Sequence, residues 1–445
     1  GVKMKESVIQ FGEGNFLRGF ADWFINGLRE KGLFDGKVVI VQPIERGLTD
    51  IINQQDGVYN LFLRGIKNGE PTVEHTRVTA VSRAINPYSD FDAYLELAHN
   101  PDMRFIISNT TEAGIAYDPD CQFGDKPHSS FPGKLTRLLF ERFSDGLPGF
   151  IILSCELIDN NGKELRSCVH RYARQWGLSA EFEKWLDEEN SFCNTLVDRI
   201  VTGYPKEEAE KLCKELGEED RLLDTAEIFH LWVIEGNFED ELPLQKAGYN
   251  VVWTDDVAPY KKRKVRILNG SHTSIVCAAL LCGLETVGES VNDEIVGVFL
   301  KECLYNEIVP TLGGSDDTVK FANDVMERFA NPYIRHLLRS IALNSVSKYS
   351  VRVLPTVMEY KEKFNEWPKG LTFALAALIR FYKTDEPSDL EKNITAIKNA
   401  DIDEILSNKA LWGADLTEMA EPVKKAYEKI EQDGARKAIE WILSE

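Results

Sequence analysis

The segment Val8-Ile-Gln-Phe-Gly-Glu-Gly-Asn-Phe-Leu-Arg-Gly19 decides how the first half of the chain is expected to fold. It begins as a short apolar strand, passes into a turn with two glycines, and continues as an amphipathic run to Lys31. This order is typical of the βα unit that binds a dinucleotide, because glycines let backbone N–H groups approach the pyrophosphate at a helix N-terminus. The third glycine of the full pattern is replaced by Leu17, so a plain tight turn is the alternative interpretation.

Further strands are expected after this unit, with helical segments between them. They are apolar or alternating runs at residues 37–41, 75–81, 104–107, 150–153 and 249–256. Alternating strands and helices predict a parallel sheet covered by helices, and from residue 164 the pattern is mainly helical. The predicted class is therefore α/β, with a Rossmann-type doubly wound domain over residues 1–257 and a mostly α-helical domain over residues 258–445.

Polar clusters follow two of these strands, at 108–114 and 154–162. Open α/β sheets bind ligands just past the carboxyl ends of their strands, although turn chemistry alone also explains such clusters. The second strand ends at Gln42 where an acid would meet the ribose of NAD, and Arg46 is placed to meet the 2′-phosphate of NADP, so both cofactors stay open. The expected cofactor-binding residues are Gly12, Gly14, Asn15, Phe16, Arg18, Gln42, Thr110, Thr111 and Glu112.

A second informative stretch is Lys264-Val-Arg-Ile-Leu-Asn-Gly-Ser-His272. In an α-helix, Asn269 and His272 would lie at roughly 140° and 80° from Lys264, and we expect the three side chains to reach one side. A lysine whose pKa is lowered can exchange a hydroxyl proton, an amide can hold a developing negative oxygen, and an imidazole adds a second hydrogen bond. The alternative is a β-hairpin, since Asn-Gly between two semi-apolar runs is its strongest short signal.

Composition excludes several classes of partner. The formal net charge of −20 argues against nucleic acid and against an anionic membrane surface, but a local basic pocket still admits a small anionic substrate. The 8 cysteines form no CxxC pair and the 7 histidines no HxxxH pair, so no metal site is expected. Scattered cysteines and the lack of a signal peptide indicate reduced thiols in the cytoplasm.

Six segments together resemble the polyol-specific long-chain dehydrogenases, the mannitol dehydrogenase family. They are GEGNFLRGF from residue 12, SNTTEAGI at 108–115, SCELIDNNG at 154–162, SFCNTLVDRIVTGYP at 191–205, DTAEIFHLWVIEG at 224–236 and PYKKRKVRILNGSHT at 259–273. The likeness continues at 328–348 and 371–382 and so covers nearly the whole chain. It implies a Rossmann-type domain followed by a helical domain, an active site between them, and no metal.

The resemblance also assigns roles to residues. It places the family's lysine, asparagine and histidine on Lys264, Asn269 and His272, and favours a helix there over the hairpin. It makes Asp198 a substrate contact. Mannitol-oxidising relatives commonly have Cys-Asp-Asn where this chain has Cys-Glu-Leu157, so the oxyanion donor at that place is lost and Asn161 is the expected substitute.

The branch of the family with the Cys-Glu-Leu-Ile form implies reversible NADH-dependent reduction of D-tagaturonate to D-altronate in hexuronate catabolism. A carboxylate on the substrate requires a cation, for which Arg199, Lys348 and Arg352 are the candidates. The alternatives are a fructuronate reductase, a mannitol-type polyol dehydrogenase, and an inactive dinucleotide-binding sensor. NADP is not excluded as the cofactor, and the protein is expected as a monomer or small homo-oligomer.

Overall fold

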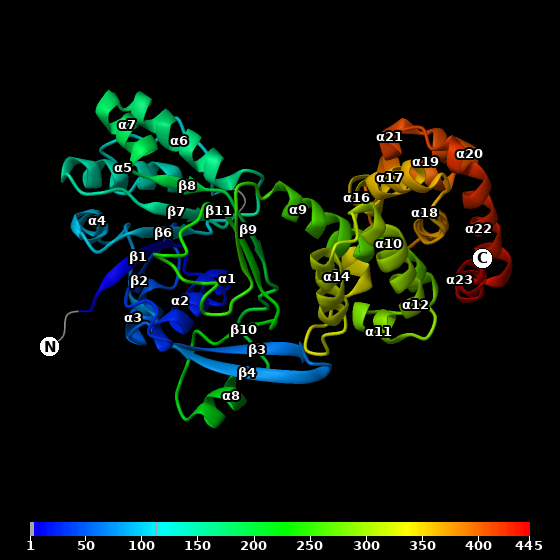
Figure 1. Cartoon of the computed structure of the whole chain (residues 1–445), viewed down its shortest axis with the longest axis horizontal. Coiled ribbons are helices and arrows are strands. Elements are labelled where there is room, and N and C mark those ends of the chain that lie inside the picture. Colours follow the sequence, from blue (N-terminus) through cyan, green and yellow to red (C-terminus); the bar gives the residue numbers. More distant parts are fainter. Residues whose placement is uncertain (1–3, 112–113) are drawn as a thin grey trace. The chain divides into compact units, whose positions relative to one another are not determined.

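A computed structural model describes residues 4–111 and 114–445, and the chain divides into two units. The first comprises residues 1–64 and 73–257, and the second comprises residues 65–72 and 258–445. The change of unit at Val257 is also the point where strands give way to helices along the chain (Figure 1). Each unit has its own architecture.

The first unit is built on a six-stranded parallel sheet. Its strands are β1 (Glu6–Phe11), β2 (Lys37–Val41), β5 (Val81–Ile85), β6 (Phe105–Ser108), β7 (Ile151–Ser154) and β8 (Ser191–Cys193). They lie in the order β5-β2-β1-β6-β7-β8, which is the 3-2-1-4-5-6 order of the dinucleotide-binding fold. The predicted α/β class is confirmed. The order in which strands are added to the sheet reverses between β1 and β6, and such folds bind ligands at this switch point.

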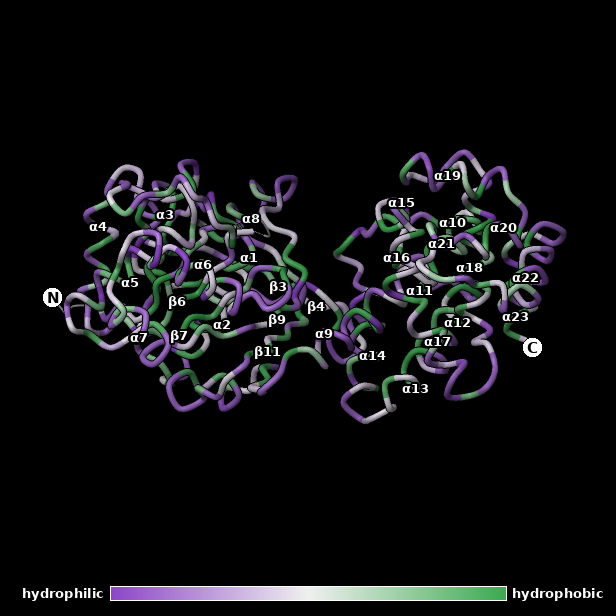
Figure 2. The backbone as a smooth tube through the Cα atoms, turned by 90° about the horizontal axis from the view of Figure 1, so that it is seen from above, coloured by the Kyte–Doolittle hydropathy of each residue, from purple (hydrophilic) through white to green (hydrophobic). Residues whose placement is uncertain are grey.

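Helices cover both faces of this sheet, so its strands are apolar on both sides. They are α1 (Asn15–Arg18), α2 (Ala21–Glu30), α3 (Thr49–Gln54), α4 (Phe91–Glu96), α5 (Phe131–Ser144), α6 (Asn161–Gln175) and α7 (Ala180–Glu188). Successive residues of one strand serve opposite faces: Val8 packs in the core with α2, whereas Ile9 packs in the core with α5 and α6. Figure 2 shows hydrophobic residues, in green, along β6 and β7.

Two sequence expectations for the first unit are wrong. The strand expected at 75–81 is the end of β4 (Glu70–Val78) and the start of β5, which belong to different sheets. β4 forms a hairpin with β3 (Tyr59–Lys67), and Asn68 and Gly69 at its turn have φ of 54° and 80°. These are the positive values that an Asn-Gly hairpin turn requires.

Residues 191–254, expected to be mainly helical up to 248, instead add short strands. Besides β8 these are β9 (Thr195–Asp198), β10 (Asp224–Ala226), β11 (Leu231–Glu235) and β12 (Val251–Thr254), with one helix, α8 (Ala209–Leu216). They form the sheets β10-β3-β4 and β12-β11-β9. Strands of three to five residues are too short to establish an alternating pattern in the sequence.

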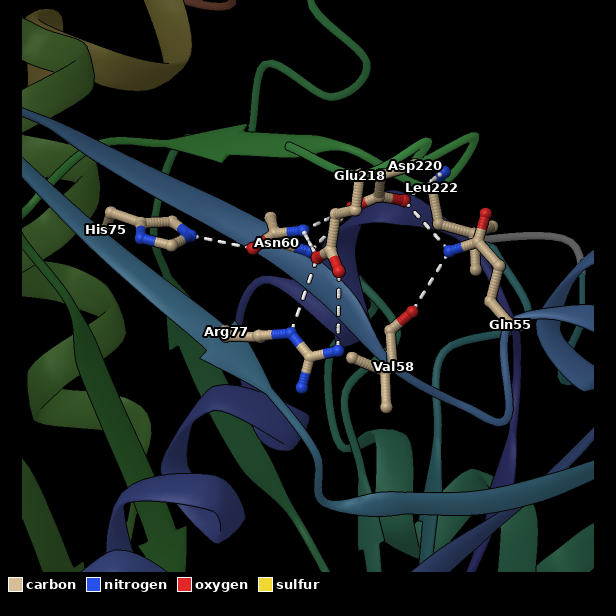
Figure 3. Close-up of polar contacts among 8 residues, drawn as sticks. All are labelled: Gln55, Val58, Asn60, His75, Arg77, Glu218, Asp220 and Leu222. Atoms are coloured by element: carbon tan, nitrogen blue, oxygen red, sulfur yellow. Dashed lines mark hydrogen bonds and ion pairs between the residues drawn. The ribbon is translucent and has the colours of Figure 1, made fainter. Parts of the chain in front are cut away.

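A polar network ties the β3–β4 hairpin to the loop before β10 (Figure 3). Asp220, which is 3% exposed, accepts hydrogen bonds from the backbone N–H and the side-chain amide of Asn60 at 2.7 and 3.0 Å. His75 Nε2 contacts the side-chain oxygen Oδ1 of Asn60 at 2.7 Å, and Arg77 pairs with Glu218 at 3.3 Å. A buried carboxylate is costly unless it is hydrogen-bonded, so Asp220 favours the arrangement in which Asn60 donates to it. These hydrogen bonds hold the loop on the hairpin.

The second unit is helical. Its elements are α9 (Ala258–Lys264), η2 (Val265–Asn269), α10 (Gly270–Leu281), α11 (Val287–Asn292), α12 (Val296–Lys301), η3 (Glu302–Ile308), α13 (Val309–Thr311), α14 (Asp316–Phe329), α15 (Leu338–Ile341), α16 (Ser345–Arg352), α17 (Leu354–Phe364), α18 (Lys369–Tyr382), α19 (Glu391–Lys398), α20 (Ile402–Ser407), α21 (Lys409–Trp412), η4 (Thr417–Met419), α22 (Ala420–Asp433) and α23 (Ala435–Ser444). α18 is its central helix, buried on nearly all sides and packed on α10 and α22. Within the described ranges, no helix is both long and apolar enough to span a bilayer.

Candidate active site

The glycine-rich turn after β1 lies at the switch point of the sheet. Gly12 has φ of 131°, and a Cβ there would lie 2.8 Å from the Asn109 carbonyl oxygen, so only glycine fits between the ends of β1 and β6. A Cβ at Gly14 would meet no atom within 4 Å. Gly14 precedes α1, and Asn15 beside it is exposed. The turn thus leaves open backbone for the pyrophosphate of a dinucleotide.

Two of the expected cofactor ligands are buried and serve the loops around the turn. The Arg18 guanidinium donates to the Glu13 and Leu222 carbonyls and to the Asn15 side chain, at 2.7–3.0 Å. Gln42 donates to two carbonyls of the loop after β2 and accepts two hydrogen bonds from Thr49. We infer that both residues shape the site rather than contact the cofactor through their side chains.

The remaining expected cofactor ligands lie on the turn and after β6. Phe16 stacks on Phe20 with ring centroids 5.0 Å apart. The Thr110 backbone N–H and hydroxyl both donate to one oxygen of Glu156, and Thr111 has φ of 70°. Glu112 lies outside the described residues. These hydrogen bonds from Thr110 to Glu156 connect the loop after β6 to the loop after β7. Burial raises the pKa of Glu156.

Asn161 is buried at the start of α6, and its amide is fully used. Its NH₂ group donates to the carbonyls of Ser154, Glu156 and Thr195 at 3.0 Å each, and its oxygen accepts from Gly162 and Thr195. Every N–H of this amide is used within the protein, so we infer a structural role for Asn161 rather than that of an oxyanion donor. Leu157, the departure from the mannitol-oxidising pattern, is 61% exposed.

Asp198 and Arg199 lie at the end of β9, both buried. The Arg199 guanidinium donates to the Gly19, Ile228 and Phe229 carbonyls and lies 4.3 Å from the Trp23 ring centroid. Burial lowers the pKa of Arg199 to about 9. Arg199 thus connects segments of the first unit through these carbonyls, and its donors are not available to bind a substrate carboxylate.

In the second unit, residues 258–281 run as one continuous helical segment, so the hairpin alternative is wrong. The α-helical angles expected for the site also fail, because Val265–Asn269 form a π-helical turn in which the Gly270 N–H bonds the Val265 carbonyl. An i→i+5 turn brings residues five apart onto the same side, which suits Lys264 and Asn269. A Cβ on Gly270 would lie 3.1 Å from the Arg352 carbonyl oxygen, so glycine admits the close approach of α16.

His272 is one turn further along the helical segment. Its ring stacks on Phe329 at 4.3 Å between centroids and meets His336 edge-on at 5.7 Å. Burial, followed by His336 and nearby cations, lowers the pKa of His272 to about 3, so the imidazole is neutral at physiological pH. Its Nε2 is buried without a hydrogen-bond partner among the described residues. A buried polar atom in that condition points to a ligand.

Three cations surround His272 and lower its pKa: Arg328, Arg352 and Lys348. Lys348 donates to the Ile341 carbonyl at 2.9 Å. Arg352 is half-buried, and within the described part of the chain no group hydrogen-bonds its guanidinium. Sequence reasoning missed Arg328, which sits eight residues before His336 in the 328–348 segment.

The described residues can also be compared with the requirements of a metal site and of a dinucleotide site. No group of three or more His, Cys, Asp or Glu among residues 4–111 and 114–445 is arranged to hold a metal ion. By contrast, the strand order, the open turn at Gly14 and the loop after β6 fit a nicotinamide dinucleotide.

Comparison with known proteins places the chain in a family. Residues 6–246 match the mannitol dehydrogenase Rossmann domain, and residues 256–432 match the mannitol dehydrogenase C-terminal domain. The altronate oxidoreductase of Yersinia enterocolitica is 45% identical over 98% of this chain and 96% of its own, and that of Pectobacterium atrosepticum is 49% identical over 87% and 81%.

Solved structures agree on the fold. A D-sorbitol dehydrogenase is 25% identical, with a TM-score of 0.85 over 98% of this chain and 95% of its own. Pseudomonas fluorescens mannitol 2-dehydrogenase, in a complex with NAD and D-mannitol, is 21% identical, with a TM-score of 0.69 over 100% and 95%. Both domains and nearly the whole length therefore agree: the chain belongs to the mannitol dehydrogenase family and is an oxidoreductase acting on CH–OH groups.

Proposed function

We propose that this protein catalyses the reversible NADH-dependent reduction of D-tagaturonate to D-altronate, a step of hexuronate catabolism. The observation that carries the proposal is identity of 45–50% to altronate oxidoreductases over most of the chain. The cations around His272 support it, because this substrate is anionic whereas mannitol and fructose are not.

We assign NAD rather than NADP as the cofactor, whose nicotinamide supplies the hydride when bound. The end of β2 offers no buried cation for a 2′-phosphate, since Arg46 is exposed and Gln42 is neutral and internally hydrogen-bonded. The glycine turn and the loop after β6 hold the dinucleotide.

In the proposed mechanism, Lys264 gives its proton to the oxygen of the ketone as the carbonyl becomes an alkoxide. The Asn269 amide, for which the described residues offer no hydrogen-bond partner, donates to that oxygen and stabilises its negative charge. His272, held neutral by its low pKa, has one ring N–H to donate and one nitrogen to accept, so it orients the oxygen without competing for the proton. In the oxidative direction Lys264 removes the hydroxyl proton.

The substrate carboxylate is assigned to Arg352. Of the three cations proposed from the sequence, Arg199 is tied to three carbonyls and Lys348 to one, whereas the Arg352 guanidinium has no hydrogen-bond partner in the described part of the chain. Its fork of donors matches a carboxylate with two parallel hydrogen bonds. Asp198 is retained as a substrate contact.

We place the reaction in the cytoplasm, carried out by a monomer or small homo-oligomer without nucleic acid or membrane as partner. All eight cysteines are free thiols, as a reducing compartment requires. The net charge of −20 disfavours anionic polymers and membranes.

The test is the loss of NADH absorbance with equal concentrations of D-tagaturonate, D-fructuronate and D-fructose. The proposal expects the highest kcat/KM on tagaturonate, with altronate and NAD supporting the reverse reaction. Equal or faster turnover of fructuronate would assign the protein to the mannonate branch, and preference for fructose would make it a polyol dehydrogenase. NADH binding without turnover of any of the three would mark an inactive sensor.

A further inference from the structure

Glu13 stands between the two glycines of the cofactor turn, and its carboxyl lacks a protein partner on one side. Its Oε2 is buried, and no described residue donates a hydrogen bond to it. Its own backbone carbonyl, by contrast, accepts from Arg18 at 3.0 Å, so the residue is fixed in place. Burial raises the pKa of Glu13 and Arg18 opposes this shift. A carboxylate buried in this way is costly unless a ligand donates a hydrogen bond to it.

The carboxyl points toward the loop that follows β2. A Cβ added to Gly47 would lie 2.5 Å from Glu13 Oε1 and 2.5 Å from Gln42 Cδ. The missing side chain at Gly47 therefore leaves the space in which the carboxyl sits, next to the end of β2. The end of β2 is where dinucleotide-binding folds place the acid that hydrogen-bonds the adenosine ribose.

No residue of the β2 end itself fills that role. Gln42 has both its amide N–H groups and its oxygen occupied within the loop. Glu45 and Arg46 follow it with exposed side chains. The position that usually carries the acid is thus structural in this chain, and an acid from the glycine turn lies beside it.

We propose that Glu13 supplies the ribose-binding carboxylate, accepting hydrogen bonds from the adenosine ribose hydroxyls and repelling the 2′-phosphate of NADP. In this proposal the ribose-binding acid lies on the glycine turn instead of at the end of β2. The absence of a side chain at Gly47 leaves the space for the Glu13 carboxyl. This inference rests on the proposed preference for NAD and names the residue that produces it.

The experiment measures binding rather than turnover. Isothermal titration calorimetry compares ADP-ribose with 2′-deoxy-ADP-ribose on the wild type and on Glu13→Gln. A hydrogen bond to a charged group corresponds to about 10- to 150-fold in affinity. The wild type is expected to prefer ADP-ribose by this factor, and Glu13→Gln to lose most of the preference. Because each preference is a ratio within one variant, a lowered fraction of folded protein cancels.

Two further variants sharpen the test. Glu45→Gln removes the same charge from an exposed position of the neighbouring loop and is expected to keep the wild-type ratio. Gly47→Ala keeps the charge of Glu13 but fills its space, and is expected to lower the ratio as Glu13→Gln does. NADPH, titrated by its fluorescence, is expected to bind Glu13→Gln at least tenfold more tightly relative to NADH than it binds the wild type.

Two results would overturn the inference: an unchanged ribose preference in Glu13→Gln, or a preference lost in Glu45→Gln instead. Either leaves the NAD preference standing if the wild type still binds NADH more tightly than NADPH. A wild type that binds NADPH more tightly refutes both the cofactor assignment and this inference. The two failures are therefore distinguishable.

Discussion

Replacing Arg352 by methionine tests the proposed substrate more directly than any change to the reacting groups. The guanidinium is half-buried without a hydrogen-bond partner in the described part of the chain, so its removal leaves no protein donor or acceptor unpaired. Burial is the main cause of the lowered pKa of Lys348 and of His272, and the charge of Arg352 adds to it, so its loss relieves this repulsion. We therefore expect the free energy of unfolding to stay constant or rise slightly.

Substrate affinity should respond strongly. A hydrogen bond between charged groups contributes about 1.5–3 kcal/mol, so KM for tagaturonate should rise about 10- to 150-fold in Arg352→Met. Arg352→Lys should recover only part of this, because a single ammonium cannot make two parallel bonds to a carboxylate. Turnover of fructose, which has no carboxylate, should not fall in either variant.

The assay is steady-state kinetics with tagaturonate and fructose, together with NADH affinity and thermal melting. Arg339→Met is the matched control, since Arg339 is an exposed arginine paired with Glu386 at 2.6 Å. A KM for tagaturonate within twofold of the wild type in Arg352→Met would refute the assignment. An equal rise in Arg339→Met would show that only the general positive field is being measured.

Three further outcomes are expected. Lys264→Ala should lose nearly all turnover while binding NADH normally, and near-normal kcat would remove Lys264 from the mechanism. Asn269→Ala should lower kcat about 10²- to 10³-fold with a smaller change in KM, measured by the same NADH assay; an unchanged kcat would exclude the amide as oxyanion donor. Glu307 is buried beneath Gly370 and its pKa is raised to about 8 from 4.5, chiefly by burial. Protonated Glu307 therefore stabilises the fold fully below pH 4.5, and this contribution of about 5 kcal/mol is lost as the pH rises to 8. Denaturant unfolding of Glu307→Gln should lack this dependence on pH.

The first unit was predictable where its strands are continuously apolar. The runs at 37–41, 104–107 and 150–153 correspond to β2, β6 and β7 within one residue, because a strand buried on both faces must be apolar throughout. The glycine turn was also found, since Gly12 has a conformation that only glycine tolerates readily. The prediction failed for short strands such as β9 and β10, which are not continuously apolar and whose pairing partners lie far away in the sequence.

The residue types of the site were easier to predict than whether their hydrogen-bond donors are available to a ligand. Arg18, Gln42, Asn161 and Arg199 have suitable chemistry, but their donors are used by carbonyls of the first unit or by neighbouring side chains. Nothing in the sequence distinguishes them from Arg352, whose donors are not used within the described residues. Hydrogen-bond satisfaction depends on tertiary neighbours, so it can be judged only in three dimensions.

The π-helical turn explains why the spacing of Lys264 and Asn269 is five rather than four. In an α-helix, residues five apart diverge by roughly 140°, whereas a turn closed by an i→i+5 hydrogen bond returns the chain to nearly the same side. The same geometry recurs in η3, where the Val309 N–H bonds the Leu304 carbonyl. Glu302, five residues before Glu307, adds to the effect of burial in raising the pKa of Glu307. A π turn is less favourable than an α turn, so it persists where packing or function requires it. At η2, Gly270 admits the close approach of the Arg352 backbone. In the mechanism proposed above, the wider turn also lets Lys264 and Asn269 serve one oxygen.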